Sequence, residues 1–191
     1  AIIHAWFPGE FGGQAIAEAL FGDYNPGGRL AVTFPKSVGQ IPFAFPFKPG
    51  SDESSETSVY GALYPFGHGL SYTTFQYSDL VISPSKQGVQ GNISISCTIK
   101  NIGQREGDEV VQLYLRDEVS SVTTYTQVLR GFERITLKPE ASHTVHFELT
   151  PQELGIWDKQ MNFTVEPGMF KVMIGSSSKD IRLKGEFEIA Q

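Results

Sequence analysis

Acidic residues are the first candidates for chemistry in this chain, because two carboxyl groups across a cleft are sufficient for acid–base or nucleophilic work such as glycoside hydrolysis. Glu10 follows an apolar run that predicts a buried strand, and open α/β sheets bind ligands at the carboxyl ends of their strands. Alternatively, Glu10 lies in the first turn of the next helix and interacts with its dipole. The run of Asp52, Glu53 and Glu56 is typical of a solvated loop. No pair stands out, so the sequence assigns no catalytic residue.

Histidine and cysteine do not predict a metal site. His4, His68, His143 and His146 are scattered, and the last two would point to opposite faces of a strand. Cys97 is the single cysteine, which excludes an internal disulfide, and its place in "SISCTIK" predicts a buried thiol. The sequence contains no phosphate loop, zinc-protease or nucleophile-elbow motif.

Aromatic residues gather in two segments that are expected to be loops or loop edges. They are Trp6, Phe7, Tyr60, Tyr64, Phe66 and Tyr72. Rings of this kind can stack on sugars or pack against a neighbouring domain. We take Trp6, Glu10 and His68 as candidate substrate-binding residues, while His68 in "FGHGLS" also fits a structural loop residue.

Composition describes a soluble globular chain. Its 191 residues are 40% hydrophobic and 19% charged, with a formal net charge of -6. No basic block is present to bind nucleic acid, and no run of about 18 apolar residues is present to span a membrane.

The first 50 residues have the pattern of an α/β unit. "AIIHAWF" and "RLAVTFP" predict strands, and between them apolar residues from Glu10 onward recur at helical spacing up to Gly22, a typical C-terminal cap. Such a unit cannot cover both faces of a parallel sheet, so we expect the rest of that domain to precede residue 1. We also expect residues 1–50 to pack on the following domain through Phe and Tyr contacts.

From about Phe75 onward, apolar and polar residues alternate with a period of two, and this pattern predicts a different architecture. "NISISCTIK", "TVHFELT" and "IRLKGEFEI" alternate apolar and polar residues, and "EVVQLYLRD", "VLRGFERITL" and "GMFKVMIG" are further strands. About seven short strands separated by turn sequences predict an antiparallel β-sandwich of immunoglobulin-like or fibronectin type III-like kind. The expected division is 1–50 for the α/β remnant, 51–74 for a linker and crossing segment, and 75–191 for the sandwich.

Several stretches, in this order, carry a resemblance to a known family. "AWFPGEFGGQAIAEALFGDYNPGGRLAVTFPKSVGQIP", "LYPFGHGLSYTTF", "CTIKNIGQREGDEVVQLYL", "LRGFERITLKPEAS" and "PGMFKVMIGSSS" resemble the C-terminal third of glycoside hydrolase family 3 enzymes, particularly bacterial β-glucosidases. The resemblance extends over nearly all of the chain. It implies a mainly β fold in which a fibronectin type III-like sandwich follows the last strand-helix-strand piece of an α/β sandwich domain.

The resemblance also implies a parent enzyme and a place for this chain within it. Family members hold a nucleophilic Asp in a barrel and an acid/base residue in the α/β domain, and both would precede residue 1. The parent would be a retaining, exo-acting β-glucosidase that needs no cofactor and is periplasmic or secreted; its missing N-terminal domains would be partners of this chain, and a β-glucoside or oligosaccharide its substrate. The chain alone would be inactive.

Three alternatives remain open at this stage. The first is a carbohydrate-binding accessory module, for which Tyr114 is the clearest outward aromatic residue while Trp157 lies in a loop. The second is an adhesion or protein-interaction module. The third is a β-xylosidase parent, because both kinds of enzyme in this family share these segments.

Overall fold

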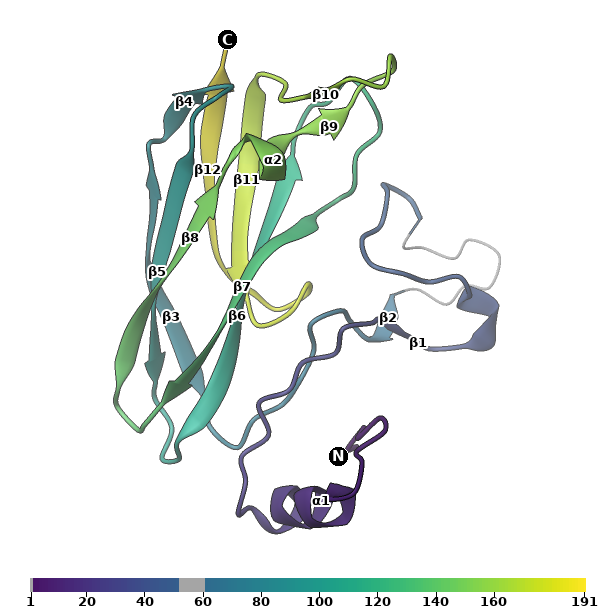
Figure 1. Ribbon diagram of the computed structural model, residues 1–191, viewed down its shortest axis with the longest axis vertical. Coiled ribbons are helices and arrows are strands. Elements are labelled where there is room, and N and C mark those ends of the chain that lie inside the picture. Colours follow the sequence, from purple (N-terminus) through teal and green to yellow (C-terminus); the bar gives the residue numbers. More distant parts are fainter. Residues whose placement is uncertain (1, 52–60) are drawn as a thin grey trace.

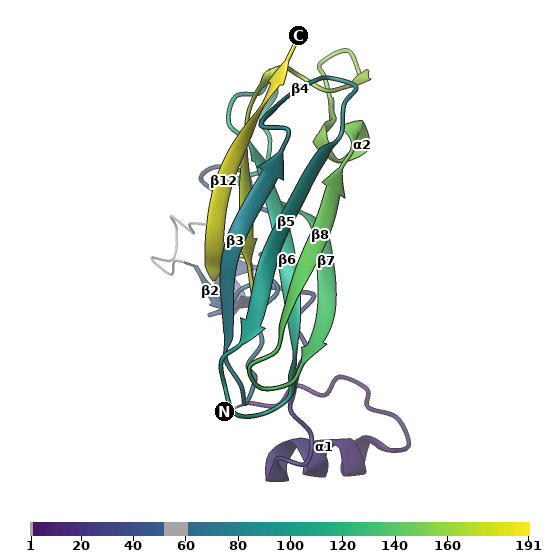
Figure 2. The same ribbon diagram turned by 90° about the vertical axis from the view of Figure 1, so that its left-hand side faces the viewer.

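Two antiparallel sheets packed face to face form the larger part of the molecule (Figures 1 and 2). The computed structural model describes residues 2–51 and 61–191. One sheet has the order β4-β12-β11-β6-β7 and the other β3-β5-β8; within them, only the pair β12 and β4 is parallel. Their bounds are β3 Phe75–Ser83, β4 Lys86–Gly88, β5 Ile93–Asn101, β6 Gly107–Asp117, β7 Val128–Leu137, β8 Ser142–Leu149, β11 Gly168–Gly175 and β12 Ile181–Ala190. The predicted mainly β sandwich is confirmed.

The core lies between the two sheets, and the predicted alternation fills it. In β5, Ile93, Ile95, Cys97 and Ile99 are all fully buried, so the Cys97 thiol is a core group as expected. They face the opposite sheet, where Phe170 stacks on Phe187 with ring centroids 5.4 Å apart. Successive strand side chains point to opposite faces, which is why every second residue enters this core.

Strand β6 departs from alternation, and one prediction fails there. Val111 to Leu115 are five consecutive buried residues, and Tyr114 is 0% exposed instead of pointing to solvent. The cause is a second layer formed by residues 2–51, which we call the N-terminal segment. Its Phe45 ring lies edge-on to the Tyr114 ring, with the ring centroids 5.7 Å apart. Because both faces of this strand are covered, Tyr114 cannot belong to a sugar-binding surface.

The N-terminal segment contains the predicted helix but not the two predicted strands. Helix α1 is Gly12–Phe21, and Gly22 ends it with a left-handed φ of +85°. Residues 2–7 form no strand, and from "RLAVTFP" only β1 (Phe34–Pro35) pairs, with β2 (Ala62–Tyr64). A strand of a parallel sheet needs parallel neighbours, and the described residues provide no parallel neighbour for either run.

Short elements complete the chain. They are η1 Val38–Gln40, α2 Pro151–Leu154, β9 Ile156–Trp157 and β10 Phe163–Thr164. Asp52, Glu53, Glu56 and Tyr60 lie outside the described residues. In the described part of the chain, the helices are all too short or too polar to cross a membrane.

The N-terminal segment is attached to the sandwich by rings and by polar bonds. Phe45 stacks on Phe66 at 4.6 Å as well as meeting Tyr114, which are contacts of the expected Phe and Tyr kind. The Phe47 carbonyl oxygen accepts a hydrogen bond from the Thr126 backbone N–H at 2.8 Å. This bond, which the sequence did not predict, holds Phe47 beside the loop between β6 and β7.

Candidate functional site

Trp6 and His68 lie at the two ends of a row of aromatic rings. The row runs Trp6, His4, Phe34, Tyr64, His68, with successive centroid separations of 4.2, 5.4, 6.1 and 5.3 Å. Such edge-to-face and stacked contacts each stabilise by about 0.5–1.5 kcal/mol beyond area burial. The structure thus connects two of the three candidate residues through β1 and β2, although they are 62 positions apart in sequence.

Trp6 has a backbone conformation that supports a special role. Its φ is +50°, in the left-handed region that bulky residues rarely adopt. Observed strain of this kind is a reason to suspect function, because surrounding contacts must hold it in place. Trp6 is also 59% exposed, so its ring is available to a ligand or to another domain.

Glu10 is placed differently from both sequence interpretations. It is exposed, it lies before α1 rather than in its first turn, and no strand precedes it. The first turn of α1 contains no acidic residue, and Phe11 at its N-terminus gives no side-chain cap. Within the described residues, Glu10 has no hydrogen-bond or ion-pair partner. No side chain in residues 2–51 and 61–191 orients its carboxylate.

A buried ion pair fixes the loop that bears His68. Arg29 Nη2 lies 3.0 Å from Glu109 Oε1 on β6, and the two side chains are 7% and 5% exposed. Burial raises the pKa of Glu109, and the Arg29 charge partly offsets that rise. Burial and the Glu109 charge also raise the pKa of the neighbouring Tyr77 phenol. Arg29 thereby anchors the N-terminal segment where Glu109 of one sheet meets Tyr77 of the other.

The backbone around His68 is held from three sides. Leu30 N–H donates to the His68 carbonyl at 2.9 Å, and Gly67 N–H donates to the Leu30 carbonyl at 2.8 Å. The Gln112 amide of β6 donates to the Gly67 carbonyl at 3.2 Å and to the Ser176 carbonyl at 2.6 Å. The His68 ring is therefore presented by a loop whose backbone is held by these bonds.

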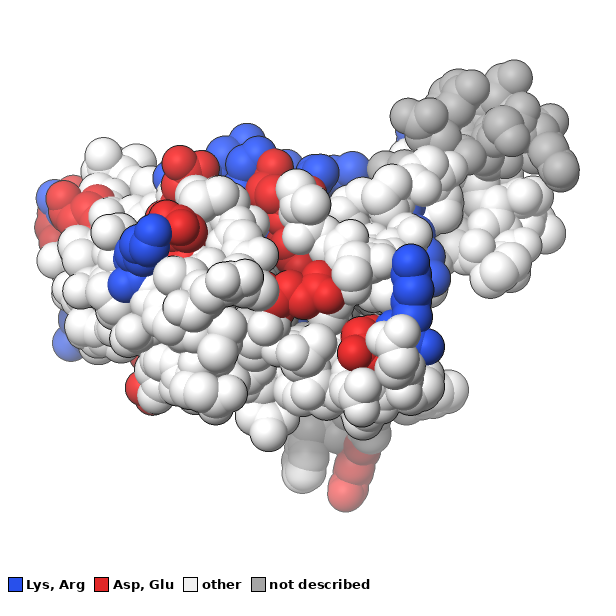
Figure 3. All heavy atoms as spheres, turned by 90° about the horizontal axis from the view of Figure 1, so that it is seen from above, with Lys and Arg blue, Asp and Glu red and all other residues white. Residues whose placement is uncertain are grey.

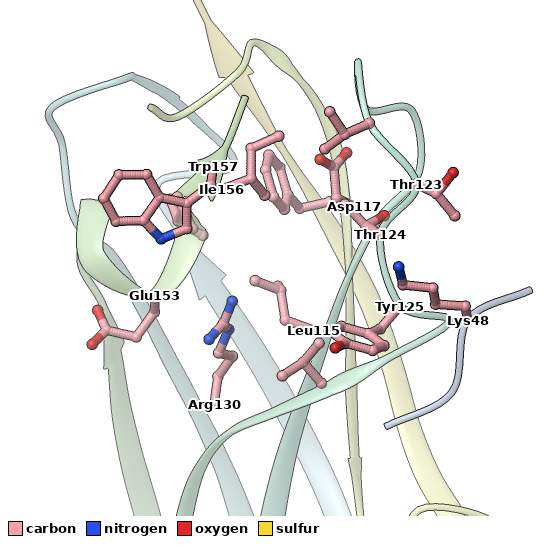
Figure 4. Close-up of a pocket in the computed structure, with 15 residues that line it drawn as sticks. Lys48, Leu115, Asp117, Thr123, Thr124, Tyr125, Arg130, Glu153, Ile156 and Trp157 are labelled. Atoms are coloured by element: carbon pink, nitrogen blue, oxygen red, sulfur yellow. The ribbon is translucent and has the colours of Figure 1, made fainter. Parts of the chain in front are cut away.

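A cavity of about 320 Å³ lies beside α2 and β9 (Figure 4). Figure 1 shows these two elements at the end of the sandwich away from α1. The end of β6, the start of β7, α2 and β9 enclose it, together with Lys48 of the N-terminal segment. Its lining includes Trp157, Tyr125, Arg130 and Asp117. Sequence reasoning missed this site, because its residues come from four separate stretches and no local spacing joins them.

Charges and metal ligands give no further site. Seen from above in Figure 3, acidic and basic side chains are interspersed with uncharged surface. Among residues 2–51 and 61–191, no group of three or more His, Cys, Asp or Glu side chains is arranged to hold a metal ion.

Two family models match the chain. Residues 1–72 match the glycosyl hydrolase family 3 C-terminal domain, and residues 109–178 match the fibronectin type III-like domain. A periplasmic β-glucosidase of Salmonella typhimurium is 44% identical over 99% of this chain, and a β-xylosidase of Formosa agariphila is 42% identical over 96%. The chain spans about a quarter of each relative's length, 26% in both cases.

Solved structures agree with these sequence matches. A β-glucosidase from Erythrobacter marinus superposes with a TM-score of 0.91 at 40% identity, covering 97% of this chain and 25% of that one. A β-glucosidase from Listeria innocua in complex with glucose gives a TM-score of 0.89 at 32% identity, covering 98% and 28%. The two domains occur here in the same order and conformation as in those enzymes. This chain therefore belongs to glycoside hydrolase family 3, of which it represents the C-terminal region.

Proposed function

We propose that this chain is the C-terminal part of a retaining, exo-acting β-glucosidase that removes terminal β-D-glucosyl residues. Its role is structural support at the border of the cleft, and the catalytic pair lies in preceding domains. Retaining hydrolysis uses two carboxyl groups about 5 Å apart, one as nucleophile and one as acid and base. That chemistry needs no cofactor.

The observation that supports this role best is the apolar surface around α1. In Figures 1 and 2 the helix lies beyond one end of the sandwich, with no sheet against it. Phe7 is 99% exposed and Phe21 84% exposed, and Phe11 and Leu20 are exposed beside them. Contiguous apolar surface of this kind marks an interface. The preceding α/β domain of the same enzyme is the partner that fits it.

Two carboxylates of the sandwich, Asp108 and Asp180, are engaged in contacts that serve the fold. Asp108 bonds to Arg134 and Thr136, and these bonds lower its pKa despite partial burial. Asp180 is held in the same way by Arg182. A carboxylate that is engaged by a neighbouring cation serves the fold, because it is neither a free nucleophile nor a proton donor at neutral pH.

Trp6, Glu10 and His68 are the residues we propose for the cleft border. The ring row places Trp6 and His68 on one ordered surface, while Glu10 depends on the preceding domain for its orientation. The name of the Salmonella relative supports a periplasmic or secreted location for the parent. The Formosa relative makes a β-xylosidase parent the second candidate, because it is nearly as similar to this chain.

The test is hydrolysis of p-nitrophenyl β-D-glucoside and β-D-xyloside by the purified 191-residue chain and by the same chain extended to include its preceding domains. We expect turnover by the extended protein alone, with the glucoside hydrolysed faster. A faster xyloside rate would favour the xylosidase parent. Turnover by the short chain that disappears in Glu10→Gln would refute the structural role.

A further inference from the structure

The cavity shown in Figure 4 has a size and a lining suited to a small ligand. Its volume of about 320 Å³ lies at the lower end of the range for ligand sites, roughly 300–1,000 Å³. Leu115, Leu154 and Phe170 from the sandwich core form an apolar floor. These three come from regular elements, so the floor is preformed.

Two cations point into this space. Figure 4 shows the Arg130 guanidinium rising from β7 and the Lys48 ammonium entering from the opposite wall. Arg130 Nε is buried and makes no hydrogen bond. Among the described residues, neither side chain has a hydrogen bond or an ion pair. A buried guanidinium donor that lacks an acceptor is costly, and a ligand oxygen would satisfy it.

Acidic groups balance these charges. The lining contains two cations, Lys48 and Arg130, and two carboxylates, Asp117 and Glu153, so its formal charges cancel. Glu153 points away from the cavity and accepts bonds from the Thr150 backbone N–H and hydroxyl. Asp117 lies at the rim, where burial raises its pKa. Lys48 and Arg130 therefore offer donors to the cavity and Asp117 offers an acceptor, which suits a ligand that carries both donors and acceptors.

Two aromatic rings flank the same space. Trp157 and Tyr125 lie on opposite sides of the cavity in Figure 4, and both are partly exposed, at 59% and 43%. Ring faces of this kind bury the apolar C–H faces of a ligand, while the charged groups bind its edge.

We propose that this cavity binds a neutral saccharide, with one pyranose ring between Trp157 and Tyr125. Arg130 and Lys48 donate hydrogen bonds to its hydroxyl oxygens, and Asp117 accepts from its hydroxyl groups. The site holds a sugar without making or breaking a bond. The assignment does not depend on which glycoside the parent enzyme hydrolyses.

Lys48 is positioned for this role by its neighbour. The Phe47 carbonyl accepts from the Thr126 N–H at 2.8 Å and from the Thr126 hydroxyl at 3.2 Å. These bonds fasten the N-terminal segment to the loop that bears Tyr125. The aromatic wall and the ammonium group are thereby held together before any ligand arrives.

The experiment is a titration of the 191-residue chain with cellobiose, followed by tryptophan fluorescence and calorimetry. The chain has two tryptophans, and Trp6 and Trp157 are equally exposed at 59%. Trp6→Phe therefore isolates the Trp157 signal, and Phe132→Ala, which removes an exposed ring of β7 outside the cavity lining, serves as the matched control. We expect saturation on the order of 1 mM, unchanged in Phe132→Ala. Affinity should fall about tenfold or more in Trp157→Ala and in Arg130→Met.

The outcomes separate the competing explanations. No saturable binding, or binding that is lost in Trp6→Phe and kept in Trp157→Ala, would overturn the proposal. Saturation by D-glucuronate at much lower concentration than by cellobiose would show an anion site and overturn the neutral ligand. Far-UV circular dichroism checks the fold of Arg130→Met, and Lys48→Met, at an exposed position, tests the same recognition if that variant does not fold.

Discussion

Replacing Arg29 by alanine removes the cation that faces Glu109 inside the molecule. The two side chains are 7% and 5% exposed, so the Glu109 carboxylate would be left buried without a counter-charge. Breaking a buried pair in this way costs about 3–5 kcal/mol. Because Arg29 belongs to the N-terminal segment, the substitution weakens the attachment of that segment to β6 by this amount of free energy.

Amide hydrogen exchange measures this attachment directly. The N–H groups of Leu30 and Gly67 are bonded to the carbonyls of His68 and Leu30, and they exchange only when the segment opens. A loss of about 3 kcal/mol corresponds to roughly a hundredfold faster exchange. We therefore expect protection at these two amides to fall by that factor in Arg29→Ala, while the Ile95 amide of β5 keeps its protection.

Two further variants make the result interpretable. Arg134→Ala breaks a more exposed pair, with Arg134 55% and Asp108 15% exposed, and should cost under about 1 kcal/mol. The double variant Arg29→Met, Glu109→Leu removes both charges and should restore most of the protection. The reasoning would be refuted if Arg29→Ala and Arg134→Ala reduced amide protection equally. It would also be refuted if the double variant had as little amide protection as Arg29→Ala.

The same pair predicts a pH dependence. Burial raises the folded-state pKa of Glu109 above its unfolded value, so the folded state binds the proton more tightly. Its contribution to stability is then fully present below the unfolded pKa and is lost as pH rises through the folded pKa. In Arg29→Met the opposing cation is gone, so protection should be weaker at pH 8 than at pH 5. Arg29→Met with Glu109→Gln should show no such slope.

Four smaller tests address the packing around β6, the core and one open glycine position. Gly67→Ala should destabilise by more than about 2 kcal/mol, because its φ is +81° and a Cβ would lie 2.0 Å from Gln112 Oε1. Gly50→Ala, with φ +79° and open space around it, should cost only about 1 kcal/mol by urea unfolding. Burial raises the pKa of Cys97 to about 11, so iodoacetamide should modify it at pH 8 only at the unfolding rate. Tyr114→Phe removes the hydroxyl that donates to Gln112 and should lower the free energy of unfolding by about 1 kcal/mol.

Local periodicity was sufficient to predict the sandwich. The set Ile93, Ile95, Cys97 and Ile99 was assigned inward from alternation alone, and all four residues are fully buried. Gly22 ended the helix as expected, because a left-handed C-terminal cap favours glycine whatever the tertiary context. Such features depend on residues within a few positions of each other.

The wrong predictions share one cause, which is dependence on a distant layer. Tyr114 was expected at the surface, and the ring of Phe45, 69 positions earlier, covers it. "AIIHAWF" has the composition of a buried parallel strand, yet in the described residues nothing pairs with it. The composition of a segment indicates the environment in which it would be stable as a strand. Whether the strand forms depends on partner strands elsewhere in the chain or in another domain.

The same dependence explains why neither candidate site could be assembled from the sequence. Trp6 and His68 were named for their type, but the His4, Phe34 and Tyr64 rings that join them required the β1–β2 pairing. The cavity needs a still longer connection, because Lys48 reaches its wall only through the bonds of Phe47 to Thr126. Both proposed sites therefore depend on the N-terminal segment, which supplies Trp6, His4 and Phe34 to the ring row and Lys48 to the cavity wall. Variants that loosen the attachment of this segment to the sandwich should weaken the cavity by removing Lys48 from its wall.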